Sequence, residues 1–421
     1  MTETQPTVDG RGPIARAVRR WLFAVGTLAL ALAASGCATG RPGGETPEAT
    51  TLGDLERARV LAAAEAALGE RPVTVTATRA ERSAGGPHDF YSEGDYWWPD
   101  PENPGGPYVR RDGLTNPDNF VAHREAMRRL GQIVPDLVSA YVLTGDARYA
   151  DAALQHIGAW FVDPATRMTP SLLYAQAISG RVTGRGIGII DTVHLVEVAR
   201  AIEVLSQSAL GETAVAPARA WFRDYLDWIT THPYGVDERD HGNNHSTAWA
   251  LQAAAFARLV GDEAVLTDVR RRFKEVLVPD QMAADGSFPK ELDRTKPYAY
   301  SLFNLDMLAM TAEAASVPGD DLWAFETADG RGLALALDFM APYVSDKESW
   351  PLPPDVSYDD DWPVRHPSLL FGGVALRRPG LVALWAKQDP APTEDEVIRN
   401  LPVRRPLLWL PPTTPIPRAV E

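Results

Sequence analysis

From Phe120 onward, the apolar residues of this chain recur at helical spacing, and two of the joints between helical stretches leave almost no room for a loop. At Gly145-Asp146 and at Gly261-Asp262, a glycine that can end one helix stands directly before an aspartate that can cap the next. A joint this short makes consecutive helices antiparallel, so the pattern predicts helical hairpins. A run of hairpins with hardly any strand alternation before residue 350 predicts an all-α fold, an α/α solenoid or toroid.

The apolar spacing places individual helices and separates the chain into four segments. Helices are expected over residues 120–144, 147–162, 188–208, 214–232, 244–260, 263–278, 299–316 and 331–343. The segments are a signal peptide (1–36), a flexible tether (37–53), the helical domain (54–380) and a proline-rich extension (381–421). Eight prolines in the extension argue against a regular helix, so it is expected to be an extended strap on the domain surface or partly disordered.

The N-terminus has the layout of a bacterial export signal. Three arginines between residues 16 and 20 precede the apolar stretch Trp21 to Ala34, which is short for a membrane span. The sequence up to Cys37, Leu-Ala-Ala-Ser-Gly-Cys, resembles the lipobox of bacterial lipoproteins, which implies lipidation of Cys37. Ala38 after this cysteine favours the outer membrane, so the protein is expected to be lipid-anchored and periplasmic. The alternative is an ordinary secretory signal in which the cysteine stands by chance.

The charge of the chain restricts its partners. The formal net charge is −15, and removal of residues 1–36, which carry +2, would bring it to −17. An acidic protein repels nucleic acids and other polyanions unless its basic groups are gathered in one place. No nucleic-acid partner is therefore expected, and membrane contact is expected only through the anchor. If the ligand is acidic, its site must be a local basic cleft.

One polar stretch, Asp240 to Ser246, directly precedes the apolar helix that ends at Gly261. Asn243 or Asn244 is expected to cap this helix, which puts His245 in the first turn, where free N–H groups attract anions. An amide, an imidazole and an anion-attracting helix end predict a site that binds a carboxylate beside a proton-transfer group. His241 and His245 have zinc-like spacing, but Gly242 stands where a zinc protease has glutamate. Neither a metal nor another cofactor is expected.

Two loops carry further candidates. The glycine-rich stretch from Gln176 to Arg185 lacks the lysine and the preceding strand of a nucleotide-binding loop, so it is either a structural loop or, as we favour, a saccharide or carboxylate subsite. Trp97 and Trp98 follow Tyr96 in a loop rich in proline and glycine. These tryptophans could stack on sugar faces or plug one end of the helical barrel, and the sequence leaves both interpretations open.

A third cluster concentrates Lys290, Arg294 and Lys296 just before Tyr298 and Tyr300. Tyrosine has an ordinary pKa of about 10, so it becomes a base near neutral pH only if cations lower that value. The neighbouring arginine and lysine are expected to do so. The acidic stretch from residue 355 to 366 could hold a metal, but a solvated acidic loop is favoured.

In order and spacing, these motifs together resemble the alginate lyase superfamily of polysaccharide lyases. The resemblance runs from about Tyr96 to about Tyr343, and its carriers are Tyr-Trp-Trp-Pro-Asp-Pro (96–101), Arg-Arg-Asp-Gly (110–113), Tyr-Ala-Gln-Ala-Ile-x-Gly (174–180), Asn-Asn-His-Ser (243–246) and Arg294 with Tyr300. It implies an (α/α) toroid or incomplete barrel that cleaves a 1,4-linked uronic-acid polymer by β-elimination without a metal. An acidic polysaccharide is then the expected partner.

The resemblance also implies roles for single residues. Asn244 would bind the uronate carboxylate, and His245 would lie beside the C5 hydrogen. Arg294 would support the carboxylate or the tyrosinate, and Tyr300 would be the acid and base, with Tyr298 as a rival. The expected substrate-binding residues are Gln176, Arg185, Asn243, Tyr298, Lys296, Trp97 and Trp98. The spacing from arginine to tyrosine, with its proline, is closer to the branch that includes glucuronan lyases, so the polymer stays open between alginate and glucuronan.

Two other functions are compatible with the same fold. A glycoside hydrolase needs two carboxylates across a cleft, and Asp240, Glu291 and Asp293 are available. A non-catalytic glycan-binding lipoprotein would keep the tryptophans but would not need Tyr300. Ultraviolet absorbance separates the lyase from the hydrolase, because only elimination leaves a double bond conjugated to the carboxylate.

Overall fold

The structure is a computed structural model that describes residues 50–417. The expected signal peptide, the lipidation site Cys37 and most of the tether lie outside the described residues. The helices are α1 (Leu52–Ala67), α2 (Ala122–Thr144), α3 (Ala147–Phe161), α4 (Leu195–Gln207), α5 (Glu212–Thr231), α6 (Pro233–Arg239), α7 (Asn244–Val260), α8 (Glu263–Arg272), α9 (Val278–Gln281), α10 (Pro289–Leu292), α11 (Pro297–Ala315), α12 (Leu333–Ser345), α13 (Pro367–Ala375), α14 (Pro379–Lys387) and α15 (Asp395–Arg399).

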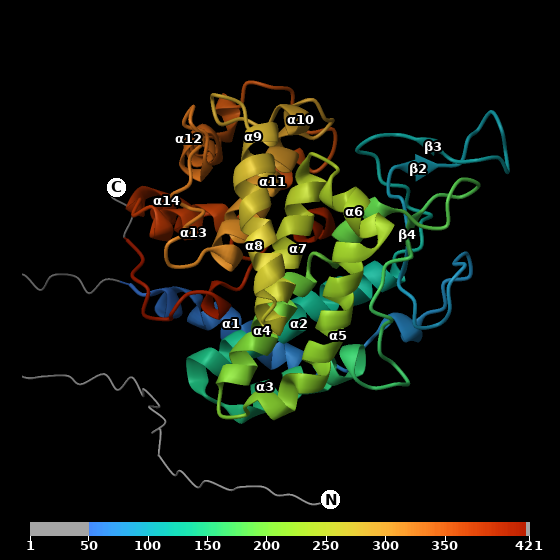
Figure 1. Cartoon of the computed structure of the whole chain (residues 1–421), viewed down its shortest axis with the longest axis horizontal. Coiled ribbons are helices and arrows are strands. Elements are labelled where there is room, and N and C mark those ends of the chain that lie inside the picture. Colours follow the sequence, from blue (N-terminus) through green and yellow to red (C-terminus); the bar gives the residue numbers. More distant parts are fainter. Residues whose placement is uncertain (1–49, 418–421) are drawn as a thin grey trace, which may run out of the picture. The chain divides into compact units, whose positions relative to one another are not determined.

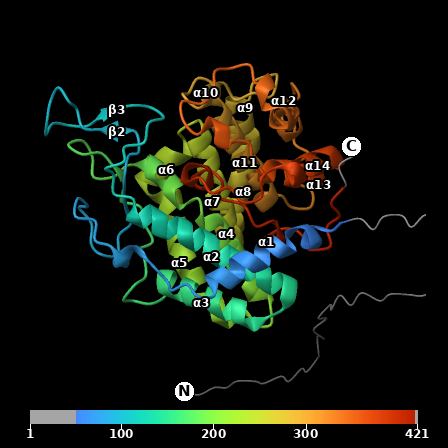
Figure 2. The same ribbon diagram turned by 180° about the vertical axis from the view of Figure 1, so that it is seen from behind.

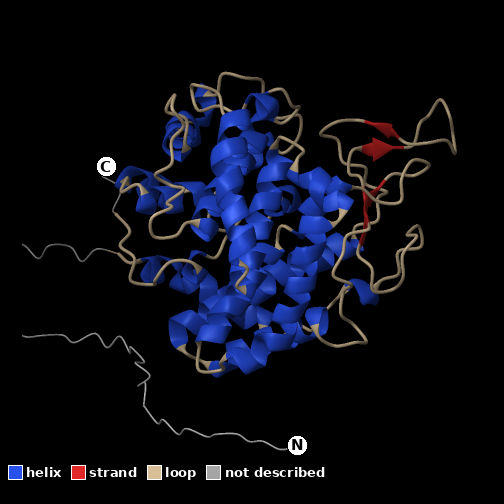
Figure 3. Cartoon of the chain, viewed as in Figure 1, coloured by secondary structure: helices blue, strands red, loops and turns tan. Residues whose placement is uncertain are grey.

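Short helical turns complete these helices, and four short strands accompany them. The turns are η1 (Val75–Ala77), η2 (Gly186–Thr192), η3 (Phe273–Leu277), η4 (Lys347–Ser349), η5 (Asp359–Asp361) and η6 (Pro406–Leu408). The strands are β1 (Tyr91–Glu93), β2 (Trp97–Trp98), β3 (Val109–Arg110) and β4 (Tyr174–Ala177). β1 pairs with β4 in parallel, and β2 pairs with β3 in antiparallel register. All four lie in loops on one side of the helices (Figure 3).

The helices form two layers, as the hairpin pattern predicts. α2, α4, α7, α11 and α13 contact one another in succession and make an inner layer, while α3, α5, α8 and α12 pack outside it (Figure 1). α7 and α11 are buried along almost their whole length, because each has helices on both sides. Seen from behind, α1 lies across α2 (Figure 2). The fold is an incomplete (α/α) toroid, in agreement with the expected class.

The two glycine–aspartate joints have the expected geometry. Gly145 and Gly261 end α2 and α7 in the left-handed conformation, with φ of 70° and 76°. Asp146 accepts a hydrogen bond from the backbone N–H of residue 148, and Asp262 accepts one from that of Val265. These caps satisfy backbone groups that a helix end leaves free, so each hairpin turns without a loop.

The C-terminal segment differs from the expectation. The boundary placed at residue 380 falls inside α14, and α15 follows it, so part of the segment is helical despite its prolines. Residues after α15 are extended apart from one short turn, and they bind the first helix: Leu52 N–H donates to Thr414 O at 2.8 Å. The side chain of Arg405 forms two hydrogen bonds of 2.5 and 2.6 Å with Asp136 of α2. The segment therefore holds α1 and α2 in place.

None of the helices between residues 50 and 417 is both long and apolar enough to cross a bilayer.

Candidate active site

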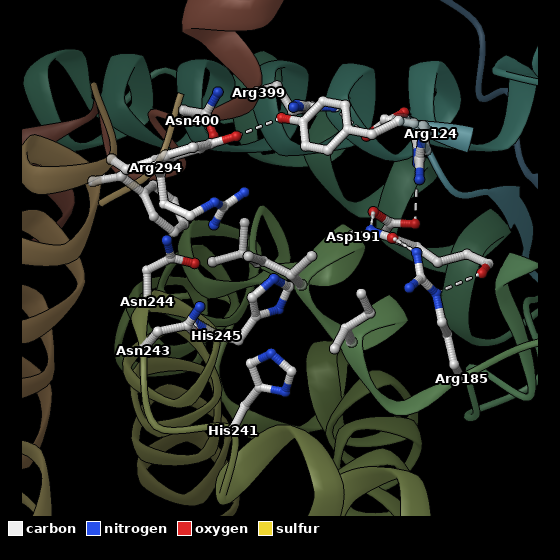
Figure 4. Close-up of a pocket in the computed structure, with 18 of the residues that line it drawn as sticks. Arg124, Arg185, Asp191, His241, Asn243, Asn244, His245, Arg294, Arg399 and Asn400 are labelled. Atoms are coloured by element: carbon white, nitrogen blue, oxygen red, sulfur yellow. Dashed lines mark hydrogen bonds and ion pairs between the residues drawn. The ribbon is translucent and has the colours of Figure 1, made fainter. Parts of the chain in front are cut away.

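A cavity of about 550 Å³ opens among the starts of α7 and α11, the face of α2 and the loop that carries β2. Asn243, Asn244, His245 and Arg294 lie on one side of it, and Arg124, Asp191 and Arg185 lie on the other, with Arg399 and Asn400 above (Figure 4). Its other lining residues are Asp95, Tyr96, Trp97, Arg110, Arg128, Gln176, Ile187, Ile190, Val193, His194, Asp237, His241, Tyr300 and Phe303. Arginines outnumber carboxylates in this lining, although the whole chain is acidic.

The start of α7 presents two amides to the cavity. Asn243 is the N-cap, because its side chain accepts the His245 N–H at 3.1 Å. Asn244 donates its backbone N–H and its side-chain amide to the two carboxylate oxygens of Glu291, at 2.8 and 2.6 Å. Since a side-chain amide has two hydrogens, one remains for a ligand. Glu291, which is buried, thus fixes the orientation of Asn244.

His245 is held by a second buried carboxylate. Its Nδ1 lies 2.9 Å from Oε1 of Glu238, a fully buried residue of α6. Burial raises the pKa of Glu238, and the His245 ring is the first group that opposes this rise. The other oxygen, Oε2, is buried without a hydrogen-bond partner in the described chain. The pairing fixes the ring of His245 and leaves its Nε2 for a ligand.

Arg294 connects the loop after β3 to the start of α11. Its guanidinium donates to both oxygens of Asp112, at 3.1 and 3.2 Å, and its Cζ lies 4.4 Å from the centre of the Tyr300 ring. Asp112 also accepts a hydrogen bond from the Thr295 hydroxyl. These contacts explain why the Arg-Arg-Asp-Gly motif belongs to the same site, although its Asp112 lies 182 residues before Arg294 in sequence.

Tyr300 lines the cavity beside Asn244 and His245, and its phenol oxygen lies 2.6 Å from that of Tyr96. Burial, followed by the neighbouring Tyr96, raises the pKa of Tyr300 well above 10. Arg294 opposes this rise but does not overcome it. The expectation that cations lower the pKa of this phenol is therefore wrong for the free protein, because desolvation outweighs the charge of Arg294. The phenol is protonated at neutral pH.

The opposite side of the cavity is built around Gln176. Its backbone has a φ of 52°, which is strained for a residue with a side chain. Arg185 donates to its backbone oxygen and to its Oε1, both at 3.0 Å, and burial lowers the pKa of Arg185 to about 10. Trp97 lines the cavity between Arg181 and Arg185. Gln176, Arg185 and Trp97 thus all line the cavity.

Three residues expected at the substrate do not line the cavity. Tyr298 is fully buried, and its hydroxyl donates to the Tyr343 carbonyl at 3.0 Å. Lys296 is buried in an ion pair of 2.9 Å with Glu396. Trp98 is turned to the loop, where its Nε1 donates to the Leu114 carbonyl. These placements correct the expected roles. The side chains of Tyr298 and Lys296 are packed in the protein interior outside the cavity lining, so Tyr298 is not an alternative to Tyr300 as the acid and base.

Several residues that line the cavity, or that hold a side chain lining it, had no signal that sequence reasoning used. Glu238 lies in α6, the helix before that of His245. Tyr96 belongs to a motif in which only the tryptophans were given a role. Arg399 and Asn400 lie in the segment that was expected to be a proline-rich extension. His241 and His245 have ring centres 5.0 Å apart. Among residues 50–417, no group of three histidine, cysteine, aspartate or glutamate side chains gathers as a metal site would require, the acidic stretch at 355–366 included.

The comparisons with known proteins identify the family and the fold. A family model described as "Alginate lyase" matches residues 74–350. Among solved structures, an alginate lyase from Bacteroides ovatus has 29% sequence identity and a TM-score of 0.73, over 85% of this chain and 93% of its own. Alginate lyase A1-III from Sphingomonas species A1 has 18% identity and a TM-score of 0.50, over 87% of this chain and 99% of its own. A variant of alginate lyase A1-III in complex with a tetrasaccharide is similar in fold, at 18% identity and a TM-score of 0.51, over 86% and 95%. No curated protein matches the chain significantly.

Proposed function

The chain belongs to the alginate lyase family and is a polysaccharide lyase, and from this premise we propose that it cleaves alginate by β-elimination in the cavity described above. The observation that carries the proposal is the convergence of Asn244, His245, Arg294 and Tyr300 on one basic cavity. Two of these side chains are held by buried glutamates, so the site is arranged before the substrate arrives.

The first chemical demand is to make the C5 hydrogen of a uronate acidic enough to leave. The neighbouring carboxylate is ionised and resists the added charge of an enolate, so donors must neutralise it. The free amide hydrogen of Asn244 and the guanidinium of Arg294 supply them. One preorganised donor of this kind is worth roughly 10²–10³ in rate.

Two proton transfers complete the reaction. We assign the C5 proton to Nε2 of His245, because its other ring nitrogen is occupied by Glu238. The C5–H electron pair becomes the C4–C5 double bond, the C4–O4 bond breaks, and the protonated phenol of Tyr300 gives its proton to O4. Exchange with solvent restores both groups. In this scheme Tyr300 is only the proton donor, whereas the resemblance implies that it is both the acid and the base.

The geometry does not favour a glycoside hydrolase. Of the carboxylates named for it, Glu291 is committed to Asn244, and Asp240 ion-pairs with Arg239 and Arg272 outside the cavity lining. Within the cavity, Asp95 and Asp191 both ion-pair with Arg124. The third carboxylate of the lining, Asp237, forms no ion pair in the described chain, so the lining offers one unpaired carboxylate where a hydrolase needs two.

An absorbance assay tests the function and the polymer together. The protein is incubated with polymannuronate, polyguluronate and glucuronan, and both ultraviolet absorbance and new reducing ends are followed. We expect absorbance and reducing ends to rise together with at least one alginate polymer, and activity on glucuronan would extend the substrate range. New reducing ends without absorbance would indicate a hydrolase, and binding without either signal would indicate a glycan-binding protein.

For the location of the protein we propose lipid anchoring through Cys37 on the periplasmic side of the outer membrane, on the basis of the lipobox-like sequence alone. In the native bacterium, the full chain should partition into detergent, and a Cys37→Ala variant should not. Equal partitioning of the two would leave an ordinary secretory signal as the explanation.

A further inference from the structure

Beyond the catalytic residues, the cavity wall holds one buried arginine whose counter-charge is a single exposed carboxylate. Arg128 lies one helical turn after Arg124 on α2, and both line the cavity. Arg124 ion-pairs with Asp95 and Asp191, Arg294 with Asp112, and Arg399 with Asp95 and Glu396. The nearest carboxylate oxygen to Arg128 belongs to Asp395, 3.8 Å away, whose side chain is 77% exposed, while that of Arg128 is only 14% exposed.

A buried ring nitrogen without a hydrogen-bond partner lies beside this arginine. His194, just before α4, is 4% exposed and lines the cavity, and its Nε2 has no hydrogen-bond partner in the described chain. Burial, followed by the charge of Arg128, lowers the pKa of His194 to about 3, so the ring is neutral. Buried polar atoms are rarely left without a partner, which makes this nitrogen a candidate for a ligand contact.

The backbone of α2 is adapted to this histidine. Gly131 follows Arg124 and Arg128 at helical spacing, so the three residues share one face of α2. A Cβ at residue 131 would lie 2.8 Å from the Cβ of His194, which is closer than side-chain atoms approach. A glycine inside a helix is less favourable than alanine. Here it makes the space in which His194 reaches the cavity.

The third element of this wall comes from the C-terminal segment. Asn400 lines the cavity directly after α15, and its Nδ2 donates to the Glu396 carbonyl at 2.8 Å, which leaves its Oδ1 as an acceptor. α15 is held in place by the ion pair of Glu396 with Lys296. The wall therefore combines a guanidinium, a ring nitrogen and an amide oxygen, which suit a carboxylate and the hydroxyl groups next to it.

We propose that Arg128, His194 and Asn400 form a second carboxylate subsite, which binds a uronate of the same polymer at a distance from the residue that undergoes elimination. This inference rests on the proposed function. Arg128 binds the carboxylate of that distal uronate, and Asn400 accepts a hydrogen bond from one of its hydroxyls. The subsite makes affinity depend on chain length, because only a substrate long enough to reach Arg128 gains the contact.

The test is a series of binding constants for oligouronates of increasing length, which we call the ladder. Saturated oligouronates of increasing length, from the polymer that wild type cleaves, are titrated into the Tyr300→Phe protein, with and without Arg128→Met. We expect the affinity of the parent protein to rise at one step of the ladder, and Arg128→Met to lose that gain, roughly 10- to 100-fold, while shorter oligomers bind as before. Arg129→Met is the matched control, because Arg129 lies on the same helix but pairs with Glu70 outside the cavity.

Two outcomes would overturn the subsite. One is a ladder for Arg128→Met that superimposes on that of its parent, and the other is an equal loss of affinity at every length. If Arg128→Met does not fold, Arg128→Lys keeps the charge but loses the planar fork, and a smaller loss at the same step is expected. Failure of the proposed function would show separately, as wild-type protein that releases no unsaturated product from any uronate polymer.

Discussion

At the scale of single residues, the hydroxyl of Tyr300 is the group whose removal should be most costly to turnover. We expect Tyr300→Phe to lower kcat by roughly 10²–10⁴-fold, because the departing O4 then has no proton donor, while substrate binding is largely kept. The matched control is Tyr298→Phe, since the Tyr298 hydroxyl contacts only a backbone carbonyl away from the cavity. Initial rates from ultraviolet absorbance and calorimetric binding measure the two effects. Full activity of Tyr300→Phe would contradict the assigned role.

The pH profile distinguishes a phenol donor from a phenolate base. The pKa of Tyr300 is raised well above 10, so its protonated form persists across the neutral and mildly alkaline range. If the protonated phenol is the working form, kcat/KM should not increase between about pH 8 and pH 10. If the free enzyme needed the phenolate, kcat/KM would increase about tenfold per pH unit over that range.

Glu238 is a positioning residue for His245, which sequence reasoning did not single out. Glu238→Gln keeps the shape but removes the charge that orients the ring, so kcat should fall roughly 10- to 1000-fold with little change in KM, and the fold should persist. Glu313→Gln is the control, because Glu313 is also a carboxyl whose pKa burial raises, but it is half-buried and accepts a hydrogen bond from the Trp323 indole rather than from a cavity residue. A fall in kcat as large for Glu313→Gln would mean that the effect is only structural.

The placement of Tyr298 and Lys296 shows where reading a cluster in sequence fails. The side chains of residues two apart on a helix are separated by about 200° around the helix axis, so Tyr298 and Tyr300 on α11 cannot both face the cavity. The sequence shows that only one of the two tyrosines can face the cavity, but it does not show which one. Glu238 could not be assigned at all, since its partner depends on how α6 meets α7.

At the scale of helices, the caps at the joints should contribute stability without affecting the chemistry. Asp262→Ala removes the side-chain acceptor for the Val265 N–H and should lower the free energy of unfolding by about 1 kcal/mol. Asp262→Asn retains an acceptor of similar capping strength and should melt close to wild type. Thermal melts check both variants, and kcat/KM should match wild type in each. A melt of Asp262→Ala that matches wild type would show that the cap contributes nothing.

The helices that sequence periodicity located are those whose ends carry local signals. α7 begins and ends where Asn243 and Gly261 predict, and the joints at residues 145 and 261 have the expected caps. α14 and α15 were missed because the eight prolines between residues 381 and 421 suggested an extended chain. None of these prolines lies inside either helix, and Pro379 occupies the first turn of α14, where it is tolerated. Contacts such as Lys296 with Glu396 join residues a hundred positions apart, which no local pattern reports.

At the scale of the whole molecule, the net negative charge and the basic cavity should have opposite effects on how kcat/KM depends on salt. The net charge of −15 repels a polyanion at long range, and this repulsion is screened as the Debye length falls from about 30 Å at 0.01 M to about 10 Å at 0.1 M salt. Ion pairs inside the cavity are screened less. We expect kcat/KM for the polymer to rise over this range and to fall at higher salt, with a weaker rise for short oligouronates. A steady fall from the lowest salt would contradict this balance.

The ion pair between Arg399 and Asp95 joins residues 304 positions apart, and with Asn400 it places a late part of the chain in the cavity wall. During folding, the toroid can therefore begin to pack its helices before its interior can hold a sugar. An intermediate in which the C-terminal segment has not docked would have a cavity open on one side, and enzymatic competence would begin only when that segment docks.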